Sequence, residues 1–271
     1  MSSTRRTSLA ISIPVHESPE CVIDQARNWR AFAPEAHVVF HFSSQANFYT
    51  RQFRCELIRA NPNAHVNNEH RNTGWADGSL IWAHISNFEY AIKNLSVAFF
   101  AFDASNTLLV REGLVDHITK HFSVDGAAGY NLPQPAIPCA SAHGLHTDNE
   151  FQLSTKLMST MPGVVPCEGI WFDTLNFARA VNNIKEREWR GQYATEEVYP
   201  VASWLLVCGP GRRCTGNYIL TPFEANLHIT QDDVSVIHHG LHKNQDLFGV
   251  KRVPREFDHP LRKTIRRLGG Y

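Results

Sequence analysis

The alternation of strand-like and helix-like segments at the N-terminus constrains the fold most. LAISIPV (9–15) is an apolar, β-branched run, which predicts a strand. SPECVIDQARNWRAF (18–32) places a serine before a proline, acids early and apolar residues at helical spacing, which predicts a helix start. HVVFHFSS (37–44) predicts a second strand. Because β-α-β is the unit of a parallel, doubly wound sheet, we expect an α/β fold with a Rossmann-like mixed sheet flanked by helices.

The next pair of segments predicts where a ligand binds. SLIWAHISNFEYAIKN (79–94) has a helical pattern, and SVAFFAFDASN (96–106) is a buried strand that ends in polar residues. In open α/β sheets, ligands bind at the carboxyl ends of the strands. Asp103, Ser105 and Asn106 therefore stand at a predicted binding edge.

The second half of the chain is less regular. The stretch 123–150 is rich in glycine, proline and small residues and has no periodicity, which predicts a long functional or mobile loop. The stretch 170–189 predicts a helix, and VYPVASWLLVCG (198–209) favours a helix, although its near-continuous apolar run does not separate helix from strand.

Paired acids, Glu196 and Glu197, precede that apolar run directly. One interpretation is a helix start, with Thr195 as the cap and acids at the positive end of the helix dipole. The other is that one carboxylate is partly desolvated and acts as a general base.

Composition excludes several classes of protein. Lys plus Arg and Asp plus Glu number 26 each, so no overall field steers the chain to nucleic acid or to an anionic membrane. Six cysteines without a CxxC pair indicate reduced thiols and argue against a zinc ribbon. No apolar run reaches spanning length, and the N-terminal stretch lacks a signal-peptide core. We expect a cytoplasmic protein without a membrane span, with peripheral association left open.

Cofactor and metal motifs are weak. No G-x-G-x-x-G follows the first strand, and GPGRRCTG (209–216) lacks the ending of a phosphate loop. The histidine-rich stretches HGLHTDNE (143–150) and HHGLH (238–242) match no spacing that fixes metal ligands. We therefore predict no cofactor and no metal site, while a metal-dependent hydrolase that uses these histidines stays open as an alternative.

The C-terminal stretch from about 243 to 267 is strongly basic in a chain of zero net charge. One interpretation is a solvated helix end without a function, and the other is a clamp for a diphosphate. Asp103 has no second acid in a D-x-D arrangement, which would supply ligands for Mg²⁺. Basic side chains would then have to offset the diphosphate charge, and this favours the clamp.

Several segments together carry a resemblance to a known family. RNTGWADGSLIWAHISNFEYAIKN and VAFFAFDASNTLLVREGLVDHI, followed by CEGIWFDTLNFARAV and TEEVYP, resemble the bacterial relatives of the core-2/I-branching β-N-acetylglucosaminyltransferase family. The order of segments matches from about Ile11 to Arg267. The chain departs from the family pattern at Asn106, where the family has an acid, at Gly169, where it has serine, and at Glu196, where it has aspartate.

The resemblance implies one glycosyltransferase domain over 1–271, with a GT-A-type fold and a basic C-terminal segment. It implies an inverting, metal-independent transfer of a sugar from a nucleotide-sugar donor to a hydroxyl of a glycan or glycolipid acceptor, in the synthesis of a surface polysaccharide. Glu197 is the expected base. The expected donor-binding residues are Pro14, His16, Glu17, Asp103, Asn106, Arg252, Arg262 and Lys263, and the expected acceptor-binding residues are Trp75, Glu168 and Trp171. A non-catalytic glycan or nucleotide-binding module remains a further alternative.

Overall fold

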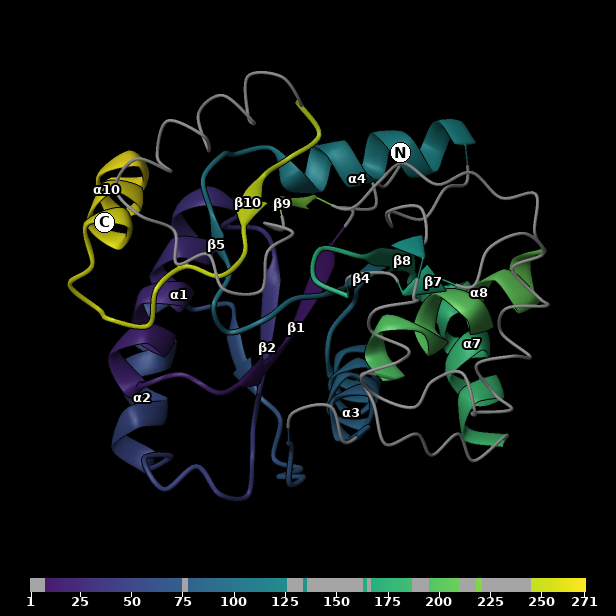
Figure 1. Cartoon of the computed structure of the whole chain (residues 1–271), viewed down its shortest axis with the longest axis horizontal. Coiled ribbons are helices and arrows are strands. Elements are labelled where there is room, and N and C mark those ends of the chain that lie inside the picture. The colour runs from purple at the N-terminus through teal and green to yellow at the C-terminus, as the bar shows by residue number, and fades with distance from the viewer. Residues whose placement is uncertain are drawn as a thin grey trace, which may run out of the picture.

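A five-stranded mixed sheet lies at the centre of the protein (Figure 1). The structure is a computed structural model that describes residues 8–74, 78–125, 134–135, 163–164, 167–186, 195–209, 218–220 and 245–271. The strand order is β3 (Ala64–Val66), β2 (His37–Phe42), β1 (Leu9–Val15), β4 (Phe99–Phe102) and β8 (Trp171–Asp173). All neighbouring pairs are parallel except β4 and β8, which are antiparallel. The predicted α/β class is confirmed.

The strand order creates a switch point between β1 and β4. The chain runs outward from β1 through β2 to β3, and then returns to add β4 on the other side of β1. At such a point the connections leave the sheet in opposite directions, which opens a crevice at the carboxyl ends of the two strands. The residues that follow Val15 and Phe102 therefore meet at the edge where ligands bind in this class of fold.

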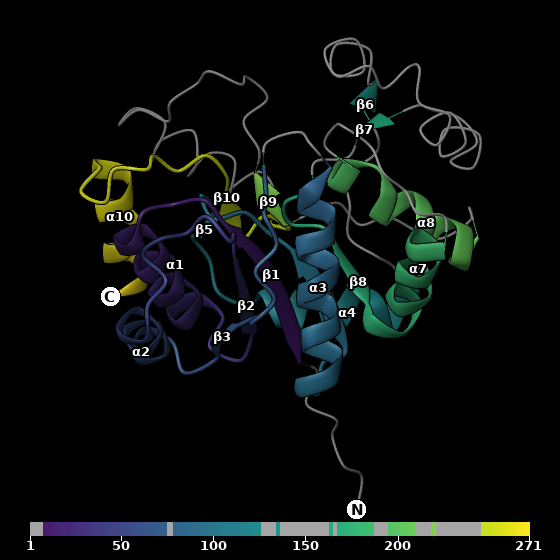
Figure 2. The same cartoon turned by 90° about the horizontal axis from the view of Figure 1, so that it is seen from below.

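Helices cover both faces of the sheet (Figure 2). One apolar core lies under α1 (Pro19–Phe32), α2 (Arg51–Ala60), α4 (Leu114–Asp125) and α10 (Pro260–Gly269). The other lies under α3 (Ser79–Asn94), α7 (Thr174–Glu186) and α8 (Tyr199–Cys208). Alternate residues of the strands supply each core, since Ile11 faces the first and Ala10 the second. The sheet is thereby buried on both sides, and its ends are left for binding.

Two smaller sheets complete the described structure. β5 (Leu108–Leu109), β10 (Gly249–Val250) and β9 (Ile219–Leu220) form a three-stranded sheet with β10 in the middle. β6 (Gln134–Pro135) and β7 (Gly163–Val164) form an antiparallel pair. The first of these sheets ties the basic C-terminal segment to the loop that follows β4.

Most of the elements expected from the sequence are present. Ser18 caps α1, where its side chain accepts a hydrogen bond from the amide of Cys21, and α3 spans the expected 79–94. The apolar run after Glu197 is a helix, α8. Of the expected loop 123–150, the first residues complete α4 and Gln134–Pro135 forms β6, while the rest lies outside the described residues.

The expected helix at 170–189 needs a correction. Its first residues form the strand β8, and the helix α7 begins only at Thr174. Trp171–Asp173 pairs with Phe99–Ala101 of β4, so the free edge of β4 takes these residues into the sheet. Asp173 then accepts a hydrogen bond from the amide of Asn176, at 2.8 Å, and starts the helix.

None of the helices in the described part of the chain combines the length and the apolarity that a bilayer crossing requires.

Candidate functional site

The residues that follow β1 and β4 are linked at the switch point. The amide of Asp103 donates to the carbonyl of Ser12, at 2.9 Å, which continues the pairing of the two strands. Beyond it, the amide of His16 donates to Ser105 Oγ at 3.2 Å, and that hydroxyl donates to Glu17 Oε1 at 3.5 Å. Two loops far apart in the sequence are thus held together at the predicted binding edge.

The segment before β8 brings a third acidic residue to this edge. The antiparallel ladder continues past the strand, because the amide of Phe102 donates to Ile170 O at 3.0 Å and that of Gly169 donates to Phe102 O at 2.8 Å. Gly169 has a φ of 81°, and a Cβ there would lie 2.7 Å from Cγ1 of Ile219. Only glycine fits this turn without strain. The turn sets Glu168 beside the end of β4.

Glu168 forms a buried ion pair with Lys251, which directly follows β10. Burial alone would raise the pKa of Glu168, but the Lys251 ammonium outweighs it and lowers that pKa. Burial alone would lower the pKa of Lys251, but the nearby carboxylate of Glu168 has the larger effect together with its hydrogen bond, so the pKa of Lys251 is raised. The amide of Val253 donates to Asn106 O at 3.0 Å, which fixes the basic segment against the loop after β4.

Glu196 and Glu197 lie in a short 3₁₀ helix, η2 (Thr195–Glu197), and not in the first turn of α8. The hydroxyl of Thr195 donates to the carbonyl of Gly78, at 3.4 Å, and α8 has no side-chain cap. The structure therefore does not support the interpretation of these residues as a capped helix start.

Burial raises the pKa values of both glutamates towards neutral pH. Burial raises the pKa of Glu196 to about 8, and the neighbouring Glu197 adds to the rise. Burial and then the charge of Glu168 raise the pKa of Glu197 to about 7. Glu196 is buried and Glu197 only half-buried, so Glu197 is the more accessible of the two. A carboxylate with a pKa near the working pH can act as a general base.

Asp103 completes a group of four carboxyl groups around one ammonium. Burial raises the pKa of Asp103 to about 7, and Glu168 contributes to the rise. The Lys251 charge acts on all four groups. We call this group the acidic cluster, and it consists of Asp103, Glu168, Glu196 and Glu197. Strongly shifted carboxyl groups beside a specific charge partner at a binding edge are typical of functional sites.

Some of the residues expected at the site lie together. Glu197, Asp103 and Glu168 belong to the acidic cluster, and the charge of Arg252 acts on Glu197. Glu17 is buried at the end of β1 and pairs with Arg255 Nε at 3.2 Å, while His16 beside it is exposed. Pro14 is buried within β1, Asn106 is half-buried in the loop after β4, and Trp75 lies outside the described residues.

Arg262 needs a correction, because its position rules out a diphosphate contact in this structure. Its side chain is fully buried, with Nη1 2.8 Å from Asp24 Oδ2 and Nε donating to Pro254 O at 2.6 Å. The guanidinium joins α10 to α1 and holds the loop that follows Arg252. Arg262 thus positions the basic segment and offers no surface to a ligand.

Neither Trp171 nor Lys263 is a member of the acidic cluster. Trp171 has no exposed surface and packs edge-on against Phe99 in the first core, so it cannot stack on a sugar here. Lys263 is exposed on α10, 3.3 Å from Asp258.

Sequence reasoning missed the roles of Lys251 and Arg255. Both belong to the basic stretch, yet no local pattern separates them from their basic neighbours. Their partners, Glu168 and Glu17, are distant in sequence. Both histidine-rich stretches, 143–150 and 238–242, fall outside the part of the chain that the structure describes.

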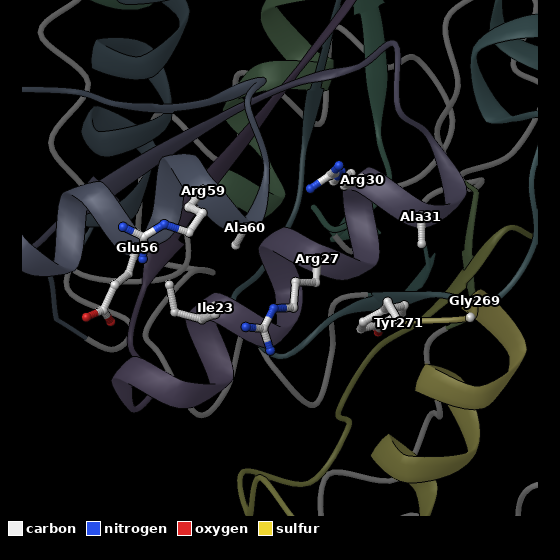
Figure 3. Close-up of a pocket in the computed structure, with 10 residues that line it drawn as sticks. Ile23, Arg27, Arg30, Ala31, Glu56, Arg59, Ala60, Gly269 and Tyr271 are labelled. Atoms are coloured by element: carbon white, nitrogen blue, oxygen red, sulfur yellow. The ribbon is translucent and has the colours of Figure 1, made fainter.

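A cavity of about 710 Å³ lies elsewhere, between α1, α2 and the C-terminal residues (Figure 3). Arg27, Arg30 and Arg59 line it together with Glu56 and Tyr271. No member of the acidic cluster contributes to its wall. Its arginines are exposed and spread along α1 and α2, so the cavity is not the catalytic candidate.

Comparisons with known proteins bear on the fold. No family model matches the chain, and no curated protein matches it. Among solved structures, an active-site mutant of LgtC superposes with a TM-score of 0.51 at 10% identity, covering 97% of this chain and 95% of that one. The galactosyltransferase LgtC in complex with donor and acceptor sugar analogues gives 0.48 at 8% identity, with the same coverage. S. aureus TarS 1–349 gives 0.40 at 13% identity, over 73% of this chain and 55% of that one. The likeness to the LgtC mutant shows that the chain has a GT-A-type fold.

Proposed function

We propose that the protein is a glycosyltransferase that moves a sugar from a nucleotide-sugar donor to a hydroxyl of a glycan or glycolipid acceptor. The observation that carries the proposal is the acidic cluster around Lys251 at the switch point of a GT-A-type sheet. The fold by itself hosts many activities, so the cluster and not the fold indicates the reaction. The motif resemblance to the core-2/I-branching family, which names Glu197 as the base, supports the same reaction.

In the proposed reaction Glu197 removes the proton from the acceptor hydroxyl. The oxygen attacks the anomeric carbon of the donor as the bond from that carbon to the diphosphate breaks on the opposite face. The configuration at the anomeric carbon is thereby inverted, and the diphosphate leaves with the bonding electron pair. A half-buried carboxylate with a pKa of about 7 is partly ionised at neutral pH and is basic enough to accept this proton.

Lys251 and Arg252 are the proposed partners of the leaving diphosphate. Lys251 lies among carboxyl groups in a largely desolvated position, where a positive charge acts strongly on nearby phosphate oxygens. Arg252 has a φ of 64°, an unusual conformation for a residue other than glycine, and such conformations cluster at functional sites. With these two cations in place, the proposed transfer needs no metal ion to offset the diphosphate charge.

The remaining contacts follow the two loops at the switch point. Pro14, His16 and Glu17 would line the nucleotide pocket, and Asp103 and Asn106 would contact the donor sugar. On the acceptor side we assign Trp75 and Glu168. A surface polysaccharide is the proposed product class, in line with the resemblance.

Thermal stabilisation by a panel of nucleotides and nucleotide sugars, each with and without EDTA, tests the proposal. A ligand at 100 times its Kd stabilises the native state by about 2.7 kcal/mol, which a melting curve detects readily. We expect one nucleoside diphosphate and its sugar conjugates to raise Tm equally in both conditions. The increment should vanish in Lys251→Met. A shift that requires metal would contradict the metal-free clamp, and the absence of any shift would contradict the donor class.

Turnover and stereochemistry then separate an enzyme from a binding module. With the donor named by the melting curves, NMR of the product from an acceptor panel should show an inverted anomeric centre. Binding of the donor without transfer to any acceptor would support the module, and a product with retained configuration would exclude Glu197 as the base of a single displacement.

A further inference from the structure

Two histidines and an aspartate meet at the opposite end of β10 from Lys251. His117 and His121 are one turn apart on α4, with ring centroids separated by 4.4 Å. His117 Nδ1 lies 3.6 Å from Asp246 Oδ1, and one ligand atom from each of the three residues lies within 4.8 Å of the others. They form the one such group of metal-ligating side chains within the described ranges.

Other contacts hold the loop that carries Asp246 against α4 and against the segment that precedes this helix. Arg111 Nη1 donates to Gln245 O at 2.9 Å, and the amide of Val110 donates to Phe248 O at 2.8 Å. The ring of His117 packs on Phe248, with centroids 5.0 Å apart. These contacts fix the backbone on both sides, so only side chains have to adjust around a ligand.

The ligand set points to a borderline metal ion. Two imidazoles one turn apart on a helix with a third ligand from elsewhere form a familiar zinc arrangement. We propose that His117, His121 and Asp246 bind one Zn²⁺ ion per chain, which ties α4 to the loop before β10. Mg²⁺ and Ca²⁺ prefer all-oxygen sites and fit this group poorly.

The local environment suits this ion. Tetrahedral zinc with bonds of about 2.0–2.1 Å places its ligand atoms roughly 3.3 Å apart, so the side chains need to close by at most about 1.5 Å. Asp246 is half exposed and has room to move.

The proposed ion would act on structure, because none of its three ligands belongs to the acidic cluster. From Asp246 to Lys251 the chain passes through β10, a path of about 16 Å when extended. The ion would therefore anchor the start of the segment whose end carries Lys251 and Arg252. This inference does not depend on the proposed glycosyl transfer.

Zinc binding to metal-stripped protein provides the test. Equilibrium dialysis followed by elemental analysis should find one tightly bound Zn²⁺ per chain. His117→Ala and His121→Ala should each weaken the affinity by more than the roughly 10- to 100-fold that loss of a second-shell partner costs. Co²⁺ in place of Zn²⁺ should give intense visible bands of a tetrahedral site, and these should disappear in both variants.

His37 and His65 provide the matched control. Their ring nitrogens lie 3.1 Å apart on neighbouring strands, without a carboxylate in the group. The double variant His37→Ala/His65→Ala should bind zinc like the unmodified protein. Absence of bound zinc in the unmodified protein, or full retention of zinc by both α4 variants, would overturn the proposal. Nucleotide-induced stabilisation should persist in His121→Ala, so failure of the zinc site and failure of the donor site are separable.

Discussion

At the scale of single residues, the degree of burial distinguishes the two adjacent glutamates. Glu197 is half-buried, whereas Glu196 is buried and its pKa is raised to about 8, which keeps it mostly protonated at neutral pH. We expect Glu197→Gln to lower kcat by roughly 10²- to 10⁴-fold, because the amide cannot accept the proton. Donor affinity, measured by calorimetry, should change little.

Glu196→Gln is the matched control for that change. It replaces the same chemical group one residue earlier, and it substitutes a neutral amide for a group that is already mostly neutral. We expect kcat to fall by less than about tenfold. Equal losses of kcat in both variants would mean that the cluster acts as one unit or that its structure was disturbed, and would remove the specific assignment of Glu197.

Lys251 has a structural effect that can be measured without substrate. Its side chain is 17% exposed and that of Glu168 is 8% exposed, so the pair is largely desolvated. Lys251→Ala leaves Glu168 charged and without this partner, and we expect a loss of roughly 3–5 kcal/mol in the free energy of unfolding in urea. Lys263→Ala is the control, because its ion pair is 52% and 78% exposed and is worth about 0–1 kcal/mol.

Adding Glu168→Gln to Lys251→Ala tests the electrostatic cause. The amide removes the unpaired charge, so the double variant should be more stable than Lys251→Ala alone. If Glu168→Gln destabilises the Lys251→Ala protein by as much as it destabilises the unmodified protein, the two residues are energetically independent. The ion pair would then not explain the loss of stability in Lys251→Ala.

At the scale of elements, local patterns predicted the segments whose shape depends on local chemistry. The Ser18–Pro19 start and the apolar spacing determine α1, and the expected bounds of α3 match the structure. The strand β8 was missed, because Trp171–Asp173 is a strand only through its pairing with β4. Helix-like composition continues through these residues, and a sheet edge distant in sequence overrides it.

Gly169 is an element-scale feature that a substitution can test. Its φ of 81° and the approach of Ile219 leave no room for a side chain. Gly270, with a φ of 66°, has open space around it, so an alanine there meets only the energetic cost of the positive φ and no steric clash. Gly270→Ala should therefore cost about 1–2 kcal/mol, while Gly169→Ala should add a steric cost of roughly 1–3 kcal/mol in thermal or urea unfolding. Equal costs would contradict the close approach of Ile219.

At the scale of the whole molecule, the site is assembled from contacts that no local pattern records. The strand ends after Val15 and Phe102 were predictable, since strand polarity places them at one edge. The pairing of Lys251 with Glu168 and the burial of Arg262 against Asp24 were not, because each joins distant segments. Two basic residues that look alike in the sequence thus have different environments. Lys251 pairs with Glu168 of the acidic cluster, whereas Arg262 forms a buried ion pair that joins α10 to α1.

The acidic cluster also makes the stability of the whole protein depend on pH. Burial raises the pKa of Glu196 to about 8 and those of Glu197 and Asp103 to about 7, so the native state holds protons that the unfolded chain has already released. The stabilisation from these bound protons is fully present below the pKa values of the unfolded chain, which are 4.5 for glutamate and 3.8 for aspartate. It is lost as the pH rises through the native pKa values of about 7 and 8.

Histidines act in the opposite direction, but at lower pH. Burial lowers the pKa of His84 to about 3 and that of His65 to about 4. Their contribution to stability is therefore present above 6.5, the pKa of histidine in the unfolded chain, and is lost only as the pH falls below that value.

Between about pH 6.5 and 8.5 the carboxyl groups therefore dominate the pH dependence. The free energy of unfolding should fall with rising pH, by at most about 1.4 kcal/mol per pH unit for each group. Urea unfolding across this range measures the slope. The double variant Glu196→Gln/Glu197→Gln should make the slope shallower, because neither amide titrates and only Asp103 of the three groups remains. An unchanged slope would show that the two glutamates are not the groups that hold the extra protons.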